Sequence, residues 1–163
     1  MAAQSEDICE VSIASDLKGM KATKCVVLTI SSYLFRLMVL IYFTPDATTK
    51  SHFAKANRLH ESDMSEQALI DAISEFSNMC CGALSRDLSP IFRHIGMSTP
   101  NILDTECASY LHLLKCGHTQ HFKVEVNNHA HLHFSLCVSE YSDIDFEVDT
   151  TTEDVSTGEL ELF

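Results

Sequence analysis

The chain contains the stretch Asp71-Ala-Ile-Ser-Glu75-Phe-Ser-Asn78-Met-Cys-Cys-Gly82, in which polar and apolar residues recur with the period of an α-helix. At about 100° per residue, the apolar side chains of residues 69–84 fall within one arc of roughly 120°, as in a helix packed on a core. Four polar-side residues share a sector of about 60° on the opposite side, and we call them the polar line. We therefore expect a long helix that buries the stripe and exposes the polar line. The polar line is Asp71, Glu75, Asn78 and Gly82, and the stripe is Leu69, Ala72, Ile73, Phe76, Cys80, Ala83 and Leu84.

The polar line has two interpretations from spacing alone. In the simpler one, Asp71 and Glu75 only keep the helix soluble, because short polar patterns recur by accident. In the other interpretation, a single partner protein contacts all four residues of the polar line simultaneously. Glycine in a helix interior costs about 1 kcal/mol relative to alanine, so Gly82 favours a face that another backbone approaches closely.

Three short motifs follow one another in this part of the sequence. The first is acid-x-x-x-Glu-x-x-Asn, formed by Asp71, Glu75 and Asn78, and the second is the run Asn-Met-x-x-Gly, which ends at Gly82. The third is a Ser-x-Pro turn that ends at Pro100, ahead of an expected strand. In this combination the segment resembles the CheX/CheC/FliY family of chemotaxis phosphatases. A single Glu-x-x-Asn copy favours the one-site CheX type over the two-site CheC type.

The resemblance implies a substrate, the phosphoaspartate of a CheY-like receiver domain. It implies that Asn78 orients the attacking water and that Glu75 pairs with the receiver's active-site Lys. Asp71 and Gly82 would assist docking, and Pro100 would shape the adjoining turn. No cofactor of its own is expected, because the receiver supplies Mg²⁺. The alternative is a non-catalytic module of the same fold that binds a receiver or only dimerises.

The order of the expected elements is strands, then helices, then strands. This order predicts an α+β fold in which an antiparallel sheet packs against a long amphipathic helix and a shorter one, as in CheC and CheX. The apolar segment 26–43 is interrupted by Ser31-Ser32 and contains Arg36, so it is read as a hairpin and not a membrane span. The expected strands are 10–18, 24–31, 33–44, 107–114, 119–126 and 130–139; the short helix runs from Thr48 or Thr49 to about Leu59, and the long one from a capping box of Asp63 and Glu66 to Pro90.

The last two strands can be placed in register by their side chains. With a three-residue loop 127–129, Phe122, Val124 and Val126 share a face with Ala130, Leu132, Phe134 and Leu136. Glu125 then lies opposite His131. The other face carries His121, His131 and His133, which a third hypothesis assigns to a metal-binding or purely structural domain. We expect no metal here, because alternating His and apolar residues are typical of one solvated sheet face.

Composition limits the class of protein. The 163 residues suit one domain at 1–139, followed by an acidic tail at 140–163 in which Ile144, Phe146 and Val148 alternate with acids and can pair as an edge strand. The net charge of −12 and the absence of Lys/Arg clusters argue against nucleic acid or an anionic membrane as a partner.

The first ten residues do not resemble a signal peptide, so we expect a cytoplasmic protein. Its seven cysteines are then expected to be mostly reduced and to fill space in the core. A homodimer through sheet edges or the tail, with the long helix free, is also expected.

Overall fold

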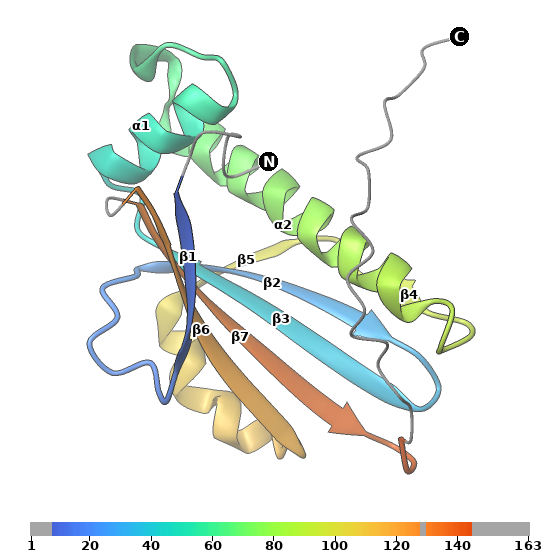
Figure 1. Cartoon of the computed structure of the whole chain (residues 1–163). Coiled ribbons are helices and arrows are strands. Elements are labelled where there is room, and N and C mark those ends of the chain that lie inside the picture. The colour runs from blue at the N-terminus through green and yellow to red at the C-terminus, as the bar shows by residue number, and fades with distance from the viewer. Residues whose placement is uncertain (1–7, 128–129, 145–163) are drawn as a thin grey trace, which may run out of the picture.

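The computed structural model describes residues 8–127 and 130–144, which form one antiparallel sheet with helices on both faces (Figure 1). The strand order is β1-β6-β7-β3-β2-β4, and β5 also pairs with β2. The α+β prediction is confirmed. The strands are β1 (Cys9–Ala14), β2 (Lys24–Ser31), β3 (Phe35–Phe43), β4 (Gly96–Met97), β5 (Asn101–Asp104), β6 (His118–Val126) and β7 (Ala130–Glu140).

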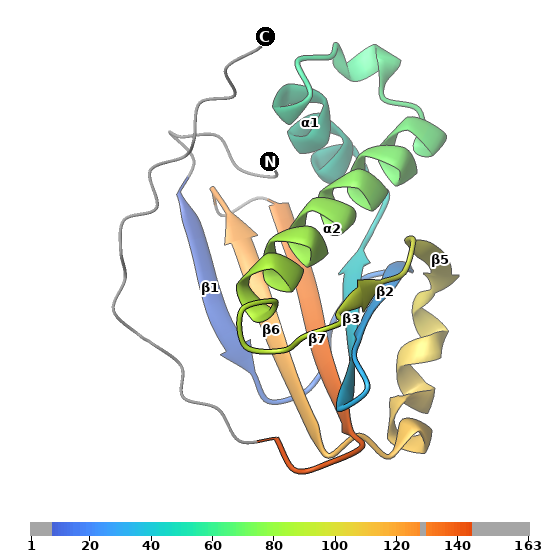
Figure 2. The ribbon, with the colours of Figure 1, turned by 90° about the vertical axis from the view of Figure 1, so that its right-hand side faces the viewer.

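The helices divide between the two faces of the sheet. The long helix α2 (Glu66–Leu88) crosses one face, with α1 (Ala47–Ala56) and the short 3₁₀ helix η1 (Glu61–Asp63) at its N-terminal end (Figure 2). The 3₁₀ helix η2 (Thr105–Leu114) lies on the opposite face. The main core is therefore between the sheet and α2, and a smaller core is between the sheet and η2.

Both α-helices begin at capping residues that the sequence did not single out. The Ser65 side chain accepts a hydrogen bond from the Ala68 N–H at 3.1 Å and caps α2, whereas Asp63 belongs to η1. Asp46, and not Thr48 or Thr49, caps α1. An N-cap satisfies an amide that the helix itself leaves unpaired, and several neighbouring Ser, Thr and Asp side chains can do this. The capping-box prediction was therefore wrong in its residues, although the long helix does end two residues before Pro90.

The two predicted hairpins are confirmed, the second of them also in its register. In the first, β2 pairs with β3 from Lys24↔Phe43 to Ser31↔Arg36. In the second, Val126 pairs with Ala130, and Glu125 lies opposite His131. Among the described residues, no helix is both long enough and apolar enough to cross a membrane.

The predicted strand 107–114 is wrong, because these residues form η2. A short apolar run cannot be assigned to strand or helix by periodicity alone. Cys107, Ala108 and Leu111 have helical spacing and pack against the smaller core. η2 ends at Lys115, which has a left-handed φ of 50°. The first predicted strand also proved too long, since β1 ends at Ala14.

Candidate functional site

The polar line lies on the side of α2 that faces away from the sheet. Asp71 and Glu75 are exposed, and Asn78 and Gly82 are half-buried. Glu75 and Asn78 are three residues apart, so their side chains are neighbours on the helix surface. All four residues lie on one helix, as predicted, but only Asp71 and Glu75 are exposed as expected. Asn78 and Gly82 lie at the flank of the helix, where the neighbouring turns cover them in part.

The buried stripe of α2 differs from the prediction in its C-terminal half. Leu69 and Ile73 are fully buried as predicted, but Phe76 and Cys80 are half-buried. Each step of four residues advances the helix surface by about 40°, and the contact with the sheet follows that drift. Ser77 can be buried at little cost, because its hydroxyl donates a hydrogen bond to the Ile73 carbonyl at 2.6 Å. The buried residues of α2 are Leu69, Ile73, Ser77 and Cys81.

The side chains of the polar line differ in their contacts within the chain. Asp71 accepts a hydrogen bond from Gln67 Nε2 at 2.9 Å, so its carboxylate is oriented by the preceding turn. Within the part of the chain that the structure describes, neither the Glu75 carboxylate nor the Asn78 amide has a hydrogen bond or ion pair. These two groups therefore keep their full hydrogen-bonding capacity for a partner.

Gly82 has a neighbour that the sequence analysis missed. A Cβ atom built on Gly82 would lie 3.7 Å from Arg86 Nη1, so the Arg86 guanidinium lies back over this glycine. That contact is an ordinary one, and packing within the chain does not require glycine here. Arg86 is four residues after Gly82, so the i, i+4 spacing of the polar line could have identified it. It adds a positive charge at the C-terminal end of the line.

The Ser-x-Pro turn lies between β4 and β5, at the edge of the sheet beyond β2. The Thr29 N–H donates to Ser98 Oγ at 2.9 Å, and the Ser98 N–H donates to the Thr29 carbonyl at 2.9 Å. Pro100 is half-buried directly before β5. Among the described residues, no hydrogen bond or ion pair joins this turn to the polar line. Its observed role is to attach the end of the α2–β5 connection to β2.

The cysteines of α2 are poor candidates for a nucleophile. Burial raises the pKa of the Cys80 thiol, and it raises that of Cys81 to about 11. Both thiols are therefore protonated at neutral pH, and a protonated thiol is a weak nucleophile. α2 thus presents an amide and a carboxylate to solvent and no activated thiol.

The histidine face shows no metal centre in the described part of the chain. His121 Nδ1 is hydrogen-bonded to Ser135 Oγ at 2.7 Å, which occupies one of its ring nitrogens. No group of three His, Cys, Asp or Glu side chains that could hold a metal is found among the described residues. The side chain of His131 lies outside the described part.

An antiparallel sheet with one long helix across one face is also the architecture of several solved CheC-like and CheX proteins. A CheC-like protein from Shewanella oneidensis MR-1 matches with a TM-score of 0.58 and 13% identity, over 82% of this chain and 85% of its own. CheX from Vibrio vulnificus matches with a TM-score of 0.57 and 12% identity, over 80% and 86%. CheX of Borrelia burgdorferi, solved as a CheX-CheY-BeF3-Mg+2 complex, matches with a TM-score of 0.57 and 12% identity, over 80% and 84%.

These likenesses establish the fold of the chain. It is the α+β fold of the CheX/CheC/FliY group, as the motifs of the long helix predicted. No protein-family model and no curated protein sequence matches the chain.

Proposed function

We propose that this protein is a phosphatase that hydrolyses the phosphoaspartate of a CheY-like receiver domain in chemotaxis or two-component signalling. The observation that carries the proposal is the pair Glu75 and Asn78, which lies on the open side of α2 without hydrogen bonds to the described residues. The solved CheX-CheY complex supports the kind of partner, because it shares this fold and its BeF₃ stands in for a phosphoryl group.

The reaction needs only one group positioned by this chain. Phosphoaspartate is an acyl phosphate and is already activated, and a receiver supplies its own Mg²⁺ and Lys. What it lacks is a water held in line with the bond that breaks. The Asn78 amide can accept a hydrogen bond from that water and donate one to a phosphoryl oxygen, without introducing charge.

The other residues of the polar line bind and orient the partner. Glu75 pairs with the receiver's active-site Lys through a charge-assisted contact that sets how far Asn78 is inserted. Asp71, oriented by Gln67, contributes a docking contact one turn earlier. Gly82 leaves room for the partner's loops when the flexible Arg86 side chain moves aside. Pro100 shapes the turn without taking part in the chemistry. The chain needs no metal of its own, and a cytoplasmic location follows from the partner proposed.

The test is a dephosphorylation assay with a panel of phosphorylated receivers from the same cell. We expect this protein to accelerate phosphate loss from at least one receiver. If it binds a receiver but accelerates none of them, the non-catalytic docking module of the same fold is the better account, because that module needs the same exposed helix.

Replacing Glu75 by Ala is expected to weaken receiver binding about tenfold or more, because a charge-assisted contact at the centre of the interface is lost. The variant should fold normally, since Glu75 is exposed and makes no contact with the core. The measurement is a titration with a receiver carrying BeF₃⁻. Asp87→Ala is the control, because it removes an exposed carboxylate of α2 outside the polar line. Equal affinities of the two variants would contradict the role of Glu75.

The protein is also proposed to dimerise through β1. This strand is at the edge of the sheet, and its Val11 and Ile13 are 65% and 72% exposed. An uncovered edge strand with apolar side chains can pair with the same strand of a second copy. A charged side chain on that strand hinders such pairing. We expect light scattering to give a dimer, and a monomer for Val11→Lys. A wild-type monomer at high concentration would remove this proposal, as would an interface that covers Asn78.

A further inference from the structure

The smaller core, between the sheet and η2, holds four of the seven cysteines. Cys25 and Cys137 are buried in it, and Cys107 and Cys116 are half-buried at its margin. All four are free thiols. A free cysteine usually serves as a small apolar filler, so a role beyond packing needs a thiol that a reagent can reach and a second thiol beside it.

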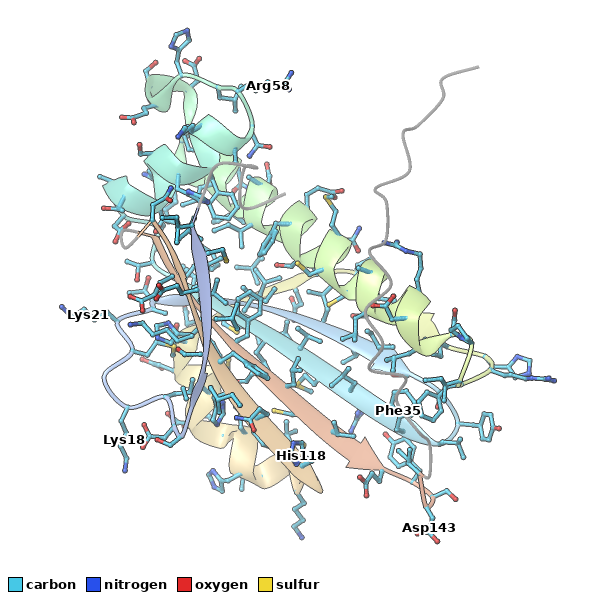
Figure 3. All side chains as sticks on the ribbon, in the orientation of Figure 1. Lys18, Lys21, Phe35, Arg58, His118 and Asp143 are labelled. Atoms are coloured by element: carbon cyan, nitrogen blue, oxygen red, sulfur yellow. The ribbon has the colours of Figure 1, made fainter. Side chains whose placement is uncertain are left out.

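Cys116 and Cys137 lie beside each other where η2 passes into β6. Figure 3 shows His118, the first residue of β6, at the end of that strand where η2 also ends, and Cys116 precedes it by two residues. The Cys116 Sγ atom is 3.6 Å from Ser139 Oγ, and Ser139 shares a face of β7 with Cys137 because the two are two residues apart. Burial raises the pKa of the Cys137 thiol, and the neighbouring Cys116 thiol adds to that rise. The structure thus supplies a pair of adjacent thiols.

Cys116 is the member of this pair that a small reagent can reach. It lines a hollow of about 380 Å³ between η2 and the sheet, together with His112 and Lys115. The Nδ1 atom of His112 is 2.9 Å from the Ser109 carbonyl oxygen, which can only accept, so Nδ1 carries a proton. In the neutral ring, Nε2 is then an acceptor, and the hollow contains a group that can take the proton of a reacting thiol.

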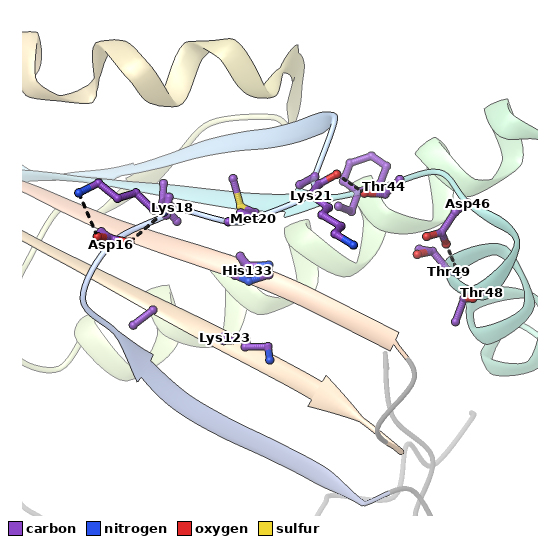
Figure 4. A pocket seen from close by; sticks show the side chains of 15 residues that line it. Asp16, Lys18, Met20, Lys21, Thr44, Asp46, Thr48, Thr49, Lys123 and His133 are labelled. Atoms are coloured by element: carbon purple, nitrogen blue, oxygen red, sulfur yellow. Dashed lines mark hydrogen bonds and ion pairs between the residues drawn. The ribbon is translucent and has the colours of Figure 1, made fainter.

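A larger hollow, of about 650 Å³, lies on the same face of the sheet and offers no thiol. Figure 4 shows that its walls come from the loop between β1 and β2, from β6 and β7, and from the start of α1. None of the described residues that line it is a cysteine. Its Lys18 and Lys123 form ion pairs with Asp16 and Glu125, at 3.7 Å and 3.1 Å. Of these two hollows, only the one beside η2 therefore brings a small reagent to a thiol.

The other two cysteines of the smaller core are less suited to react. Cys25 is completely buried, and neither Cys25 nor Cys107 is among the described residues that line the two hollows. Burial raises the pKa of both thiols. A protonated thiol is a weak nucleophile, so neither of them can readily attack an oxidant.

We propose that Cys116 and Cys137 are a site of reversible oxidation by hydrogen peroxide, at which the two thiols close to a disulfide. The Cys116 sulfur attacks one peroxide oxygen, the O–O bond breaks, and Cys116 sulfenic acid and one water form. The Cys137 sulfur then attacks the Cys116 sulfur, the S–O bond breaks, and the hydroxyl leaves with the Cys137 proton as a second water. Two thiols are oxidised to one disulfide, and the peroxide is reduced to two waters. The site lies on the face of the sheet opposite α2, so it does not depend on the proposed phosphatase function.

Peptide mapping of the oxidised full chain tests the pairing without any substitution. Trypsin cleaves after Lys and Arg, so the four cysteines of the smaller core fall in four separate peptides, 25–36, 94–115, 116–123 and 124–163. The folded protein is treated with hydrogen peroxide, its remaining thiols are blocked with N-ethylmaleimide, and the peptides are analysed by mass spectrometry without reduction. We expect 116–123 linked to 124–163, about tenfold or more abundant than any other linked pair and lost on treatment with dithiothreitol. If no linked pair forms, or if 25–36 linked to 94–115 dominates, the proposal is wrong.

Two variants test the order of the steps. Cys137→Ala removes the second thiol, so the reaction should stop at Cys116 sulfenic acid, which dimedone traps about tenfold or more than in the wild type. Cys107→Ala is the matched control, because it removes another half-buried thiol of the same core and should leave the 116–137 link intact. Thermal melts check that both variants are folded. If dimedone labels Cys116 equally in Cys137→Ala and in the wild type, or if Cys107→Ala loses the link, the proposed site is wrong.

Discussion

Replacing Asn78 by Ala is expected to lower the accelerated dephosphorylation of the cognate receiver by about 100-fold or more, because the attacking water loses the group that positions it. Receiver binding should stay within a few-fold of wild type. An uncharged amide at the edge of the exposed face contributes more to the placement of the water than to docking. The loss should therefore appear in the maximal rate and not in the receiver concentration needed for half-maximal rate.

The measurement is phosphate loss from a radiolabelled receiver, alongside a binding titration with a receiver carrying BeF₃⁻. Asn101→Ala is the matched control, because it removes an exposed amide on β5 away from α2. Asn78→Asp tests the chemistry further, since a carboxylate can accept from the water but cannot donate to the phosphoryl oxygen. Equal rates for wild type and Asn78→Ala, together with clear binding, would leave the docking module as the function.

Replacing Ile73 by Ala is expected to lower the free energy of unfolding by about 2–5 kcal/mol. Ile73 is fully buried between α2 and the sheet, so the substitution removes apolar contacts and leaves a cavity. Its backbone carbonyl accepts the Ser77 hydroxyl and is unchanged by the substitution, so the lost side-chain packing accounts for the effect. The loss is a large fraction of the total stability of a domain of this size.

Urea denaturation followed by circular dichroism measures this effect. Asp71→Ala is the control on the other side of the same helix, and it should change the unfolding free energy by about 0.5 kcal/mol or less. The two substitutions together separate the roles of the two faces of α2. An unchanged midpoint for Ile73→Ala would show that α2 is not held by the main core.

Much of the site was predictable because its pattern is local. The polar line occupies one side of α2, and a helix brings residues three and four apart together whatever the rest of the chain does. The two hairpins, and the register of the second, were predictable for the same reason, since a short loop joins each strand pair and one face must be apolar. The CheX/CheC fold followed from the motifs around Glu75 and Asn78.

The errors arose where a local pattern fits two structures. The run 107–114 has apolar residues that suit a strand or a helix, so its local pattern could not decide between the two. Burial of Ser77 and Cys81 in place of Phe76 and Cys80 depends on how α2 lies across a twisted sheet, which no window of sequence contains. Ser65 caps α2 because it is the residue at which the backbone changes from extended to helical.

The sequence by itself determined the long amphipathic helix, its polar line with Glu75 and Asn78, and the pairing of adjacent strands, because each depends on residues close together in the chain. Only the tertiary structure decided the position of η2, the contact of Arg86 with Gly82, and the approach of the β1–β2 loop to β6 and β7. The β1–β2 loop is about a hundred residues from β6 in the sequence, and the two meet only when the whole sheet is assembled. Packing free energy over the complete sheet, and not local preference, fixes such contacts.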